Sequence, residues 1–181
     1  MGEWMPGRPR QPEDVEQLLV SFGPRVYGLL FRLVGRPDVA EDLMQETLLR
    51  AFRSLDTYRP EGKFQAWIFR IAVNLARDWI RRRHREPSSS LDDELEPNVA
   101  APSEKSPRPE ASMVTGERSR RVDEAMARLP TADREVLLLR YYGDLAFKDI
   151  AEATGEPLGT VLARAHRALK KLGDLIPEGD V

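Results

Sequence analysis

One predicted helical face carries residue types that suit single-stranded nucleic acid. Within residues 64–83, an indole, an amide and guanidinium groups recur at steps of three and four residues, which places them on one side of a helix. This basic stripe consists of Trp67, Arg70, Asn74, Arg77 and Arg81. An indole can stack on a base, an amide can hydrogen-bond to a base edge, and guanidinium groups can bind phosphates. A solvated basic face with Trp67 in the core has the same spacing, so the stripe alone leaves two interpretations open.

A second pattern, near the C-terminus, is typical of a DNA-binding helix-turn-helix. Ala151 allows two helices to approach, Gly155 suits the turn, Val161 anchors the second helix, and Pro157 suits its first turn. We expect the second helix to bury Val161, Ala165, Ala168, Leu169 and Leu172. Its outward recognition face would then consist of Thr160, Arg164, Arg167, Lys170 and Lys171. Such a helix can enter the major groove of DNA, although many helical hairpins share this spacing.

Enzymatic chemistry has little support in the sequence. The chain has no cysteine, which excludes disulfides, thiolate zinc sites and thiol nucleophiles. Of its two histidines, His84 lies in an arginine run and His166 lies on the predicted basic helix, where solvent or phosphate suits them better than a metal. The sequence therefore offers no convincing metal cluster, and we expect no cofactor and no bound metal.

The charge of the chain divides it into three parts. Residues 1–85 hold 15 Lys and Arg against 11 Asp and Glu, residues 86–117 hold 2 against 8, and residues 118–181 hold 11 against 11. The acidic middle part has five prolines and no aromatic residue, so we interpret it as a flexible linker. We expect a disordered N-terminus over residues 1–12 and two small domains over residues 13–85 and 118–177.

Both flanking parts are predicted to be helical, because apolar residues recur at helical steps. A first apolar stripe is expected to end at Gly23 and Pro24, where a new helix would begin. Further helices are expected over residues 38–55, with Phe52 among the core positions, and over residues 64–83. The fold class is therefore all-α, with two helical domains joined by the linker. The apolar runs are too short to cross a bilayer and residues 1–13 lack an apolar block, so we expect a soluble, cytoplasmic protein without membrane insertion.

Read together, these segments resemble the sigma factors of bacterial transcription. Residues 40–46, followed by residues 49–52, are similar to the polymerase-binding part of sigma region 2. Residues 64–74, with Asp78 and the arginine run after it, resemble the segment that melts promoters and reads the minus-ten element. Residues 129–130, 134–136, 139–140, 149–151 and 159–161, with Arg164, resemble region 4. Two such domains in a short chain are typical of the extracytoplasmic-function (ECF) group of the sigma-70 family.

This resemblance implies a non-enzymatic initiation factor that binds core RNA polymerase and promoter DNA. Asp42, Gln45 and Glu46, the acid–amide face, would contact the basic clamp helices of the polymerase. The basic stripe would bind the single-stranded minus-ten element, with Asn74 reading a flipped base. The recognition face would bind the duplex minus-thirty-five element, and an anti-sigma factor would be a further partner.

The chain also departs from the family pattern. Ile68 follows Trp67 where primary sigma factors usually pair two tryptophans, which implies weaker melting. Leu162 and Ala163 replace polar or cationic residues, and Ala146 replaces a helix-capping residue. Two rival interpretations therefore stay open, a stand-alone helix-turn-helix regulator and an enzyme such as a helical nuclease or transferase.

Overall fold

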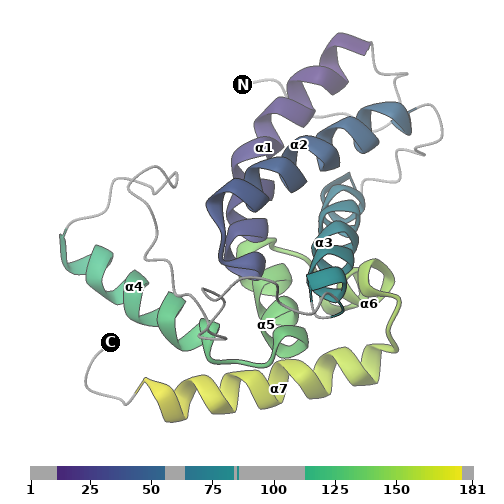
Figure 1. The fold of residues 1–181 in the computed structure, drawn as a ribbon. Coiled ribbons are helices and arrows are strands. Elements are labelled where there is room, and N and C mark those ends of the chain that lie inside the picture. The colour runs from purple at the N-terminus through teal and green to yellow at the C-terminus, as the bar shows by residue number, and fades with distance from the viewer. Residues whose placement is uncertain (1–11, 56–63, 84, 86–112, 177–181) are drawn as a thin grey trace.

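The protein is a two-domain helical structure in the residues that the computed structural model describes, which are 12–55, 64–83, 85 and 113–176. The N-terminal domain consists of α1 (Pro12–Val34), α2 (Pro37–Arg53) and α3 (Phe64–Arg83). The C-terminal domain consists of α4 (Met113–Ala127), α5 (Thr131–Leu137), a π-helical segment (Leu138–Tyr142), α6 (Phe147–Thr154) and α7 (Leu158–Leu175) (Figure 1). Throughout these ranges helices are the only regular elements, as the sequence predicts. Within the same part of the chain, none of the helices is long and apolar enough to span a membrane.

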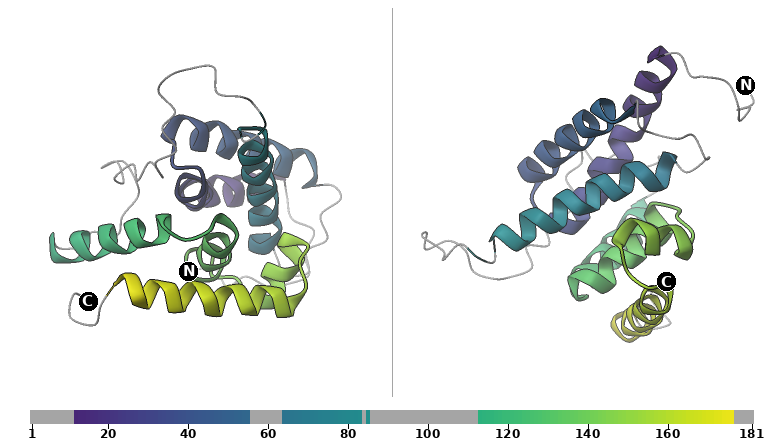
Figure 2. Two further views of the ribbon diagram at one scale, coloured as in Figure 1. Left: turned by 60° about the horizontal axis from the view of Figure 1, so that its bottom comes forward. Right: turned by 90° about the vertical axis from the view of Figure 1, so that its right-hand side faces the viewer.

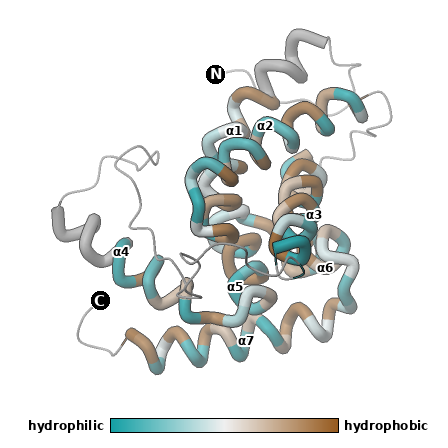
Figure 3. Tube along the Cα trace, viewed as in Figure 1, coloured by the Kyte–Doolittle hydropathy of each residue, from teal (hydrophilic) through white to brown (hydrophobic). Residues whose placement is uncertain are grey.

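The N-terminal domain is built around the buried faces of α1 and α3. Val26, Leu29 and Leu30 of α1 and Ile68 and Phe69 of α3 are fully buried, and α2 packs against both helices. Residues of this kind recur at helical steps, so each helix has one apolar side to bury. The same packing sets which side of α3 is left for other contacts. Figure 3 shows the resulting mixture of apolar and polar residues along each helix.

The expected break at Gly23 and Pro24 is wrong, because α1 is a single helix with Pro24 inside it. A proline within a helix removes one backbone hydrogen bond and crowds the preceding turn. Leu19 and Val26, on either side of the proline, are both buried. Burial on both sides of Pro24 therefore outweighs the local cost and keeps the helix continuous.

Two apolar residues that we expected in the core are exposed. Phe52 is 56% exposed near the end of α2, and Leu169 is 44% exposed on α7. The buried strip of α7 is narrow, since Val161, Ala165 and Ala168 suffice to pack it against α5 and α6. Leu169 lies one residue, or about 100° of helical rotation, beyond that strip. Leu172, which we also expected to be buried, is only partly buried against the core.

The domain boundaries differ slightly from the expected ones. The helix α4 begins at Met113, inside the range 86–117 that we interpret as a linker, and α1 begins at Pro12. The other residues of the predicted linker and N-terminal segment, and His84 and residue 177, lie outside the described residues.

The helix-turn-helix has the predicted turn. Gly155 follows α6 with a φ of 68°, the left-handed conformation that glycine adopts without steric cost. Ile150 of α6 and Val161 of α7 are fully buried beneath the turn. Ala146, which precedes α6, makes no side-chain capping bond. The turn therefore sets the angle at which α7 leaves α6.

The two domains pack against each other through α5, the π-helical segment and α6. The strongest contact between domains is that of α6 with α3, and the π-helical segment contacts α1. Figures 1 and 2 show α7 beyond this layer, on the side of the C-terminal domain away from α1 and α2. Gly28 of α1 leaves room for Tyr142, whose ring carbon Cζ would lie 2.7 Å from an added Cβ. The buried apolar residues of both domains form one continuous cluster.

A pair of glycine substitutions tests the assigned turn. We expect Gly155→Ala to lower the free energy of unfolding by about 1–2 kcal/mol, because the left-handed backbone strains any residue with a Cβ. Gly173→Ala, within α7 and with open space around the new methyl group, should raise it by about 0.5–1 kcal/mol. Urea unfolding measures both changes. Equal effects of the two substitutions would contradict the turn geometry.

Candidate nucleic-acid interface

The basic stripe lies along α3, but its five members have different surroundings. Arg70, Asn74 and Arg81 are exposed, and Arg81 pairs with Asp78 on the same helix. Trp67 and Arg77 are partly buried. The helix therefore brings all five residues to one side, as the spacing predicts. Three of them are exposed, and two are partly buried.

Trp67 lies at the edge of the core. Its indole ring packs against Phe64 with ring centroids 5.4 Å apart and an interplanar angle of 53°. Each of the two interpretations of Trp67 is therefore met in part, since the ring contacts the core and is still partly exposed. Packing on one side restricts the rotamers of the indole, which favours a fixed stacking surface.

Arg77 is held by the C-terminal domain. Its Nε and Nη2 donate to Oε2 and Oε1 of Glu135 at 2.9 and 2.6 Å, a two-bond geometry. Its Nη1 donates to the backbone oxygen of Thr154 at 2.9 Å, and Nη2 lies 3.5 Å from Oε1 of Glu156. Burial raises the pKa of Glu135, and the adjacent Arg77 opposes that rise. Sequence reasoning missed this contact, because the partners are 58 residues apart.

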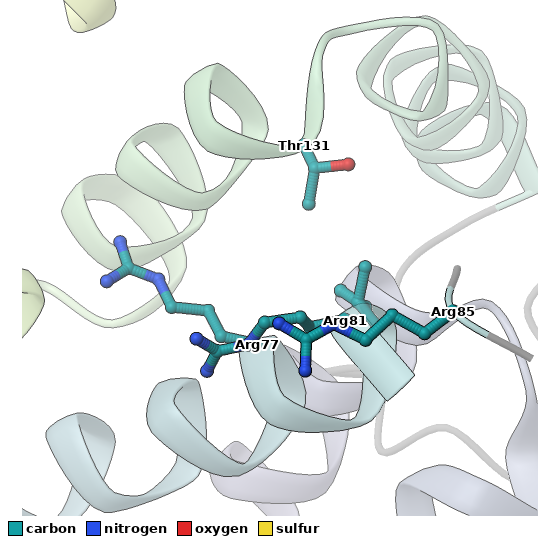
Figure 4. Close-up of a pocket in the computed structure, with 5 residues that line it drawn as sticks. Arg77, Arg81, Arg85 and Thr131 are labelled. Carbon is teal, nitrogen blue, oxygen red and sulfur yellow. The ribbon is translucent and has the colours of Figure 1, made fainter. Parts of the chain in front are cut away.

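A groove runs between the end of α3 and the start of α5. It has a volume of about 450 Å³ and is lined by Arg77, Ile80, Arg81, Arg85 and Thr131. Figure 4 shows the three arginines on one side of the groove and Thr131 on the other. The atoms that line the groove are apolar, and the guanidinium groups of Arg77 and Arg81 are bound to Glu135 and Asp78.

The recognition face lies on α7, on the outer side of the C-terminal domain. Thr160, Lys170 and Lys171 are exposed. Arg164 lies 3.2 Å from Glu156, and Arg167, which is 62% exposed, lies 3.0 Å from Asp133. Leu158 and Leu162 are each 44% exposed beside these cations. The face thus combines five polar or cationic residues with an apolar margin that the sequence analysis did not assign to it.

The acid–amide face lies on α2. Asp42 and Gln45 are exposed, and Glu46 is partly exposed and paired with Arg50 at 2.6 Å. Leu49 and Phe52 continue along α2 at helical steps and are 42% and 56% exposed. Both residues lie in the segment 49–52 that resembles the polymerase-binding part of region 2, and of the two we expected only Phe52 in the core.

The part of the chain that the structure describes contains no cluster of side chains suited to a metal ion. Within that part, no group of three or more His, Cys, Asp or Glu side chains is placed to hold a metal ion. His166 is exposed on α7.

The Arg77 contact can be tested without any ligand. Arg77→Ala should speed hydrogen exchange of the backbone amides of α6 by roughly tenfold, because a charge-assisted hydrogen-bonded pair contributes about 1.5–3 kcal/mol and Arg77 is 30% exposed. Arg70→Ala, on the exposed part of the same helix, is the matched control and should leave α6 unchanged. The same exchange rate in the two variants would rule out the contact.

Comparison with known proteins agrees with this arrangement of surfaces. Residues 18–86 match the family model for sigma-70 region 2, and residues 119–172 match that for sigma-70 region 4. The ECF RNA polymerase sigma factor SigE of Mycolicibacterium smegmatis is 35% identical over 89% of this chain, which spans 61% of that relative's length. The ECF RNA polymerase sigma-E factor of Haemophilus influenzae is 34% identical over 88% of this chain and 86% of the relative.

Solved structures show the same fold. The sigma factor RpoE in complex with the anti-sigma factor NepR, from Bartonella quintana, aligns with a TM-score of 0.76 and 24% identity over 92% of this chain and 99% of that chain. CnrH, in complex with the cytosolic domain of CnrY, aligns with a TM-score of 0.61 and 24% identity over 91% and 88% of the two chains. With both region models matched in order and full-length relatives above 30% identity, this chain belongs to the ECF group of the sigma-70 family of RNA polymerase sigma factors.

Proposed function

We propose that the protein binds core RNA polymerase and directs it to promoters, where it helps to open the DNA. The observation that carries this proposal is the order of the region 2 and region 4 matches along a chain whose surfaces are sorted by charge. An acid–amide face lies on α2, a basic stripe on α3 and a recognition face on α7. This sorting provides separate surfaces for a protein and for two parts of a promoter.

The acid–amide face is the surface that we assign to the polymerase. Carboxylates and an amide on an exposed helix favour a cationic partner, because like charges at an interface are costly and opposite charges speed association. Leu49 and Phe52 add exposed apolar area beside Asp42 and Gln45. Apolar and aromatic groups at the centre of an interface contribute most of its binding free energy. We therefore include Leu49 and Phe52, which lie in the segment 49–52 that resembles the polymerase-binding part of region 2, in the surface assigned to the polymerase.

The basic stripe is the surface that we assign to the minus-ten element. Unstacking a base costs a few kcal/mol, and stacking it on an aromatic ring returns about 1–3 kcal/mol. Trp67 provides one such ring, while Ile68, the next residue, is fully buried. With a single ring, this chain depends on a second contact to hold an unstacked base, and the exposed amide of Asn74 is the group that can supply it.

The recognition face is the surface that we assign to the minus-thirty-five element. The helix α7 would lie in the major groove with its amino end near a phosphate and its cations along the backbone. Arg164 and Arg167 must then exchange Glu156 and Asp133 for DNA. Leu162 stands where polar contacts are common in the family, and its exposed methyl groups suit the methyl group of thymine.

The proposed function also implies where the protein acts and which further partner it has. A factor of this kind works where the polymerase and chromosome are, so we place it in the cytoplasm and give it no catalytic role of its own. One similar solved structure holds the sigma factor RpoE bound to the anti-sigma factor NepR, and we propose a partner of that kind for this chain.

Substitution of the acid–amide face tests polymerase binding. Gln45→Ala combined with Glu46→Ala should weaken the affinity for core polymerase at least tenfold, because it removes an amide and a carboxylate from the exposed side of α2. Fluorescence anisotropy of labelled protein titrated with core polymerase measures this affinity. Unchanged holoenzyme assembly would refute the assignment, and an absence of binding by the wild-type protein would refute the proposed function and favour a stand-alone DNA regulator.

Substitution of Asn74 tests promoter opening. Asn74→Ala should lower the rate of open-complex formation by about tenfold or more while leaving the affinity for core polymerase unchanged, because a base-edge contact contributes about 1–3 kcal/mol. Run-off transcription and permanganate footprinting of the minus-ten element measure opening. Equal losses in opening and in polymerase affinity would show that Asn74 acts on the fold and has no role in reading a base.

A further inference from the structure

Two carboxylates at the contact between the domains hold two arginines that the proposed function gives to DNA, Arg77 from the N-terminal domain and Arg164 from the C-terminal domain itself. Glu156, in the turn between α6 and α7, has its Oε1 3.2 Å from Nη1 of Arg164 and 3.5 Å from Nη2 of Arg77. Glu135 of α5 accepts two hydrogen bonds from Nη2 and Nε of Arg77, at 2.6 and 2.9 Å. Two carboxylates of the C-terminal domain thus hold one arginine of the basic stripe and one of the recognition face.

A carboxylate and a phosphate bind a guanidinium group in the same way, through two parallel N–H···O bonds. One guanidinium group can therefore not make this bidentate bond to Glu135 and to a DNA phosphate at once. We propose that Glu135 and Glu156 act as an internal mimic of DNA phosphates, which keeps the two domains closed and withholds the basic stripe from promoter DNA until polymerase binding separates them. This inference rests on the proposed function and adds to it a mode of regulation.

The closed arrangement also blocks the path of a DNA strand. A strand that follows the stripe from Trp67 to Arg81 must pass Arg77, whose side chain reaches the backbone of Thr154 at the end of α6. The carboxylates at this point repel phosphates in addition to filling the space. Asp42 and Gln45 stay exposed in the same arrangement, so the surface assigned to the polymerase is available before the stripe is.

Further contacts along the interface between the domains stabilise the closed state. Gln65 donates to the backbone oxygen of Gly143, and Arg134, the pKa of which burial lowers, donates to the backbone oxygen of Leu33 at 3.2 Å. Arg32 pairs with Asp123 at 3.0 Å, and its guanidinium carbon lies 4.7 Å from the ring centre of Tyr142. Because the domains share one chain, their effective concentration is on the order of millimolar, and modest contacts suffice to hold them together.

The carboxylates are the part of this interface that a substitution can remove selectively. The side chain of Glu135 is 3% exposed, and that of Glu156 is 21% exposed in a surface turn. Glu135→Gln and Glu156→Gln, alone and together, keep the size of each side chain and remove its charge. Neither residue belongs to the surfaces assigned to polymerase or DNA. Glu124→Gln, at an exposed position of α4, makes the same change of charge and is the matched control.

Energy transfer between two dyes on the full chain measures the closed state. Since the chain has no cysteine, Val20→Cys on α1 and Asp174→Cys on α7, both at exposed positions, provide unique labelling sites. We expect one high-transfer population in the free wild-type protein and in Glu124→Gln. The double variant Glu135→Gln with Glu156→Gln should lower the ratio of closed to open molecules at least tenfold, and core polymerase should open all of them.

Run-off transcription provides the functional measurement. The double variant should reach half of its maximal transcription at a protein concentration at least fivefold below that of the wild-type protein and of Glu124→Gln, with the same maximum. Energy transfer or half-maximal concentrations equal to those of the control would overturn the inference, as would opening without any change in transcription. A wild-type protein that supports no promoter-specific transcription would instead refute the proposed function.

Thermal unfolding followed by circular dichroism separates these outcomes from misfolding. Should Glu135→Gln unfold the C-terminal domain, the single variant Glu156→Gln still tests the inference, because its side chain lies in a surface turn. We expect this variant to shift energy transfer and the half-maximal concentration in the same direction by a smaller factor. A folded Glu156→Gln protein that matches Glu124→Gln in both measurements would overturn the role of Glu156 as a phosphate mimic.

Discussion

The pairing of Arg77 with the buried carboxylate of Glu135 is the constraint on which the arrangement of the two domains depends. A carboxylate that is 3% exposed needs a cationic partner, since an unpaired buried charge costs several kcal/mol. That partner comes from α3 of the other domain, so the charge of Glu135 is buried and paired across the interface between the domains. The pair contributes specificity of docking more than net stability, because each group also loses its hydration.

This constraint links the three binding surfaces to one another. The acid–amide face on α2 does not depend on the docking, while the basic stripe on α3 shares Arg77 with it and the recognition face on α7 shares Arg164 through Glu156. A change at the interface therefore acts directly on Arg77 of the basic stripe and leaves the surface assigned to polymerase accessible, whereas the pair of Arg164 with Glu156 lies within the C-terminal domain and does not depend on the docking. The helices of each domain stay intact, so the coupling needs only a change in how rigid bodies are placed.

Local features of this fold could be predicted from the sequence, and contacts between distant residues could not. The helical spacing of α3 and the Ala151, Gly155 and Val161 pattern depend on nearby residues, and the structure has both features as expected. The continuity of α1 through Pro24 and the exposure of Phe52 and Leu169 depend on what packs against each helix. The Arg77 contact joins residues 58 apart, and no periodic signal marks Glu135 as the partner.

Arginine suits position 77 better than lysine because of the geometry of its charged group. A lysine there would offer a compact charge that binds a carboxylate or a phosphate without a fixed geometry, whereas the guanidinium group presents two parallel donors that fit either anion. Arg77 can therefore exchange Glu135 for a phosphate with little change in the number or geometry of its hydrogen bonds. Because this exchange is nearly balanced, we expect a small difference in free energy between the closed and open arrangements to decide which anion Arg77 holds.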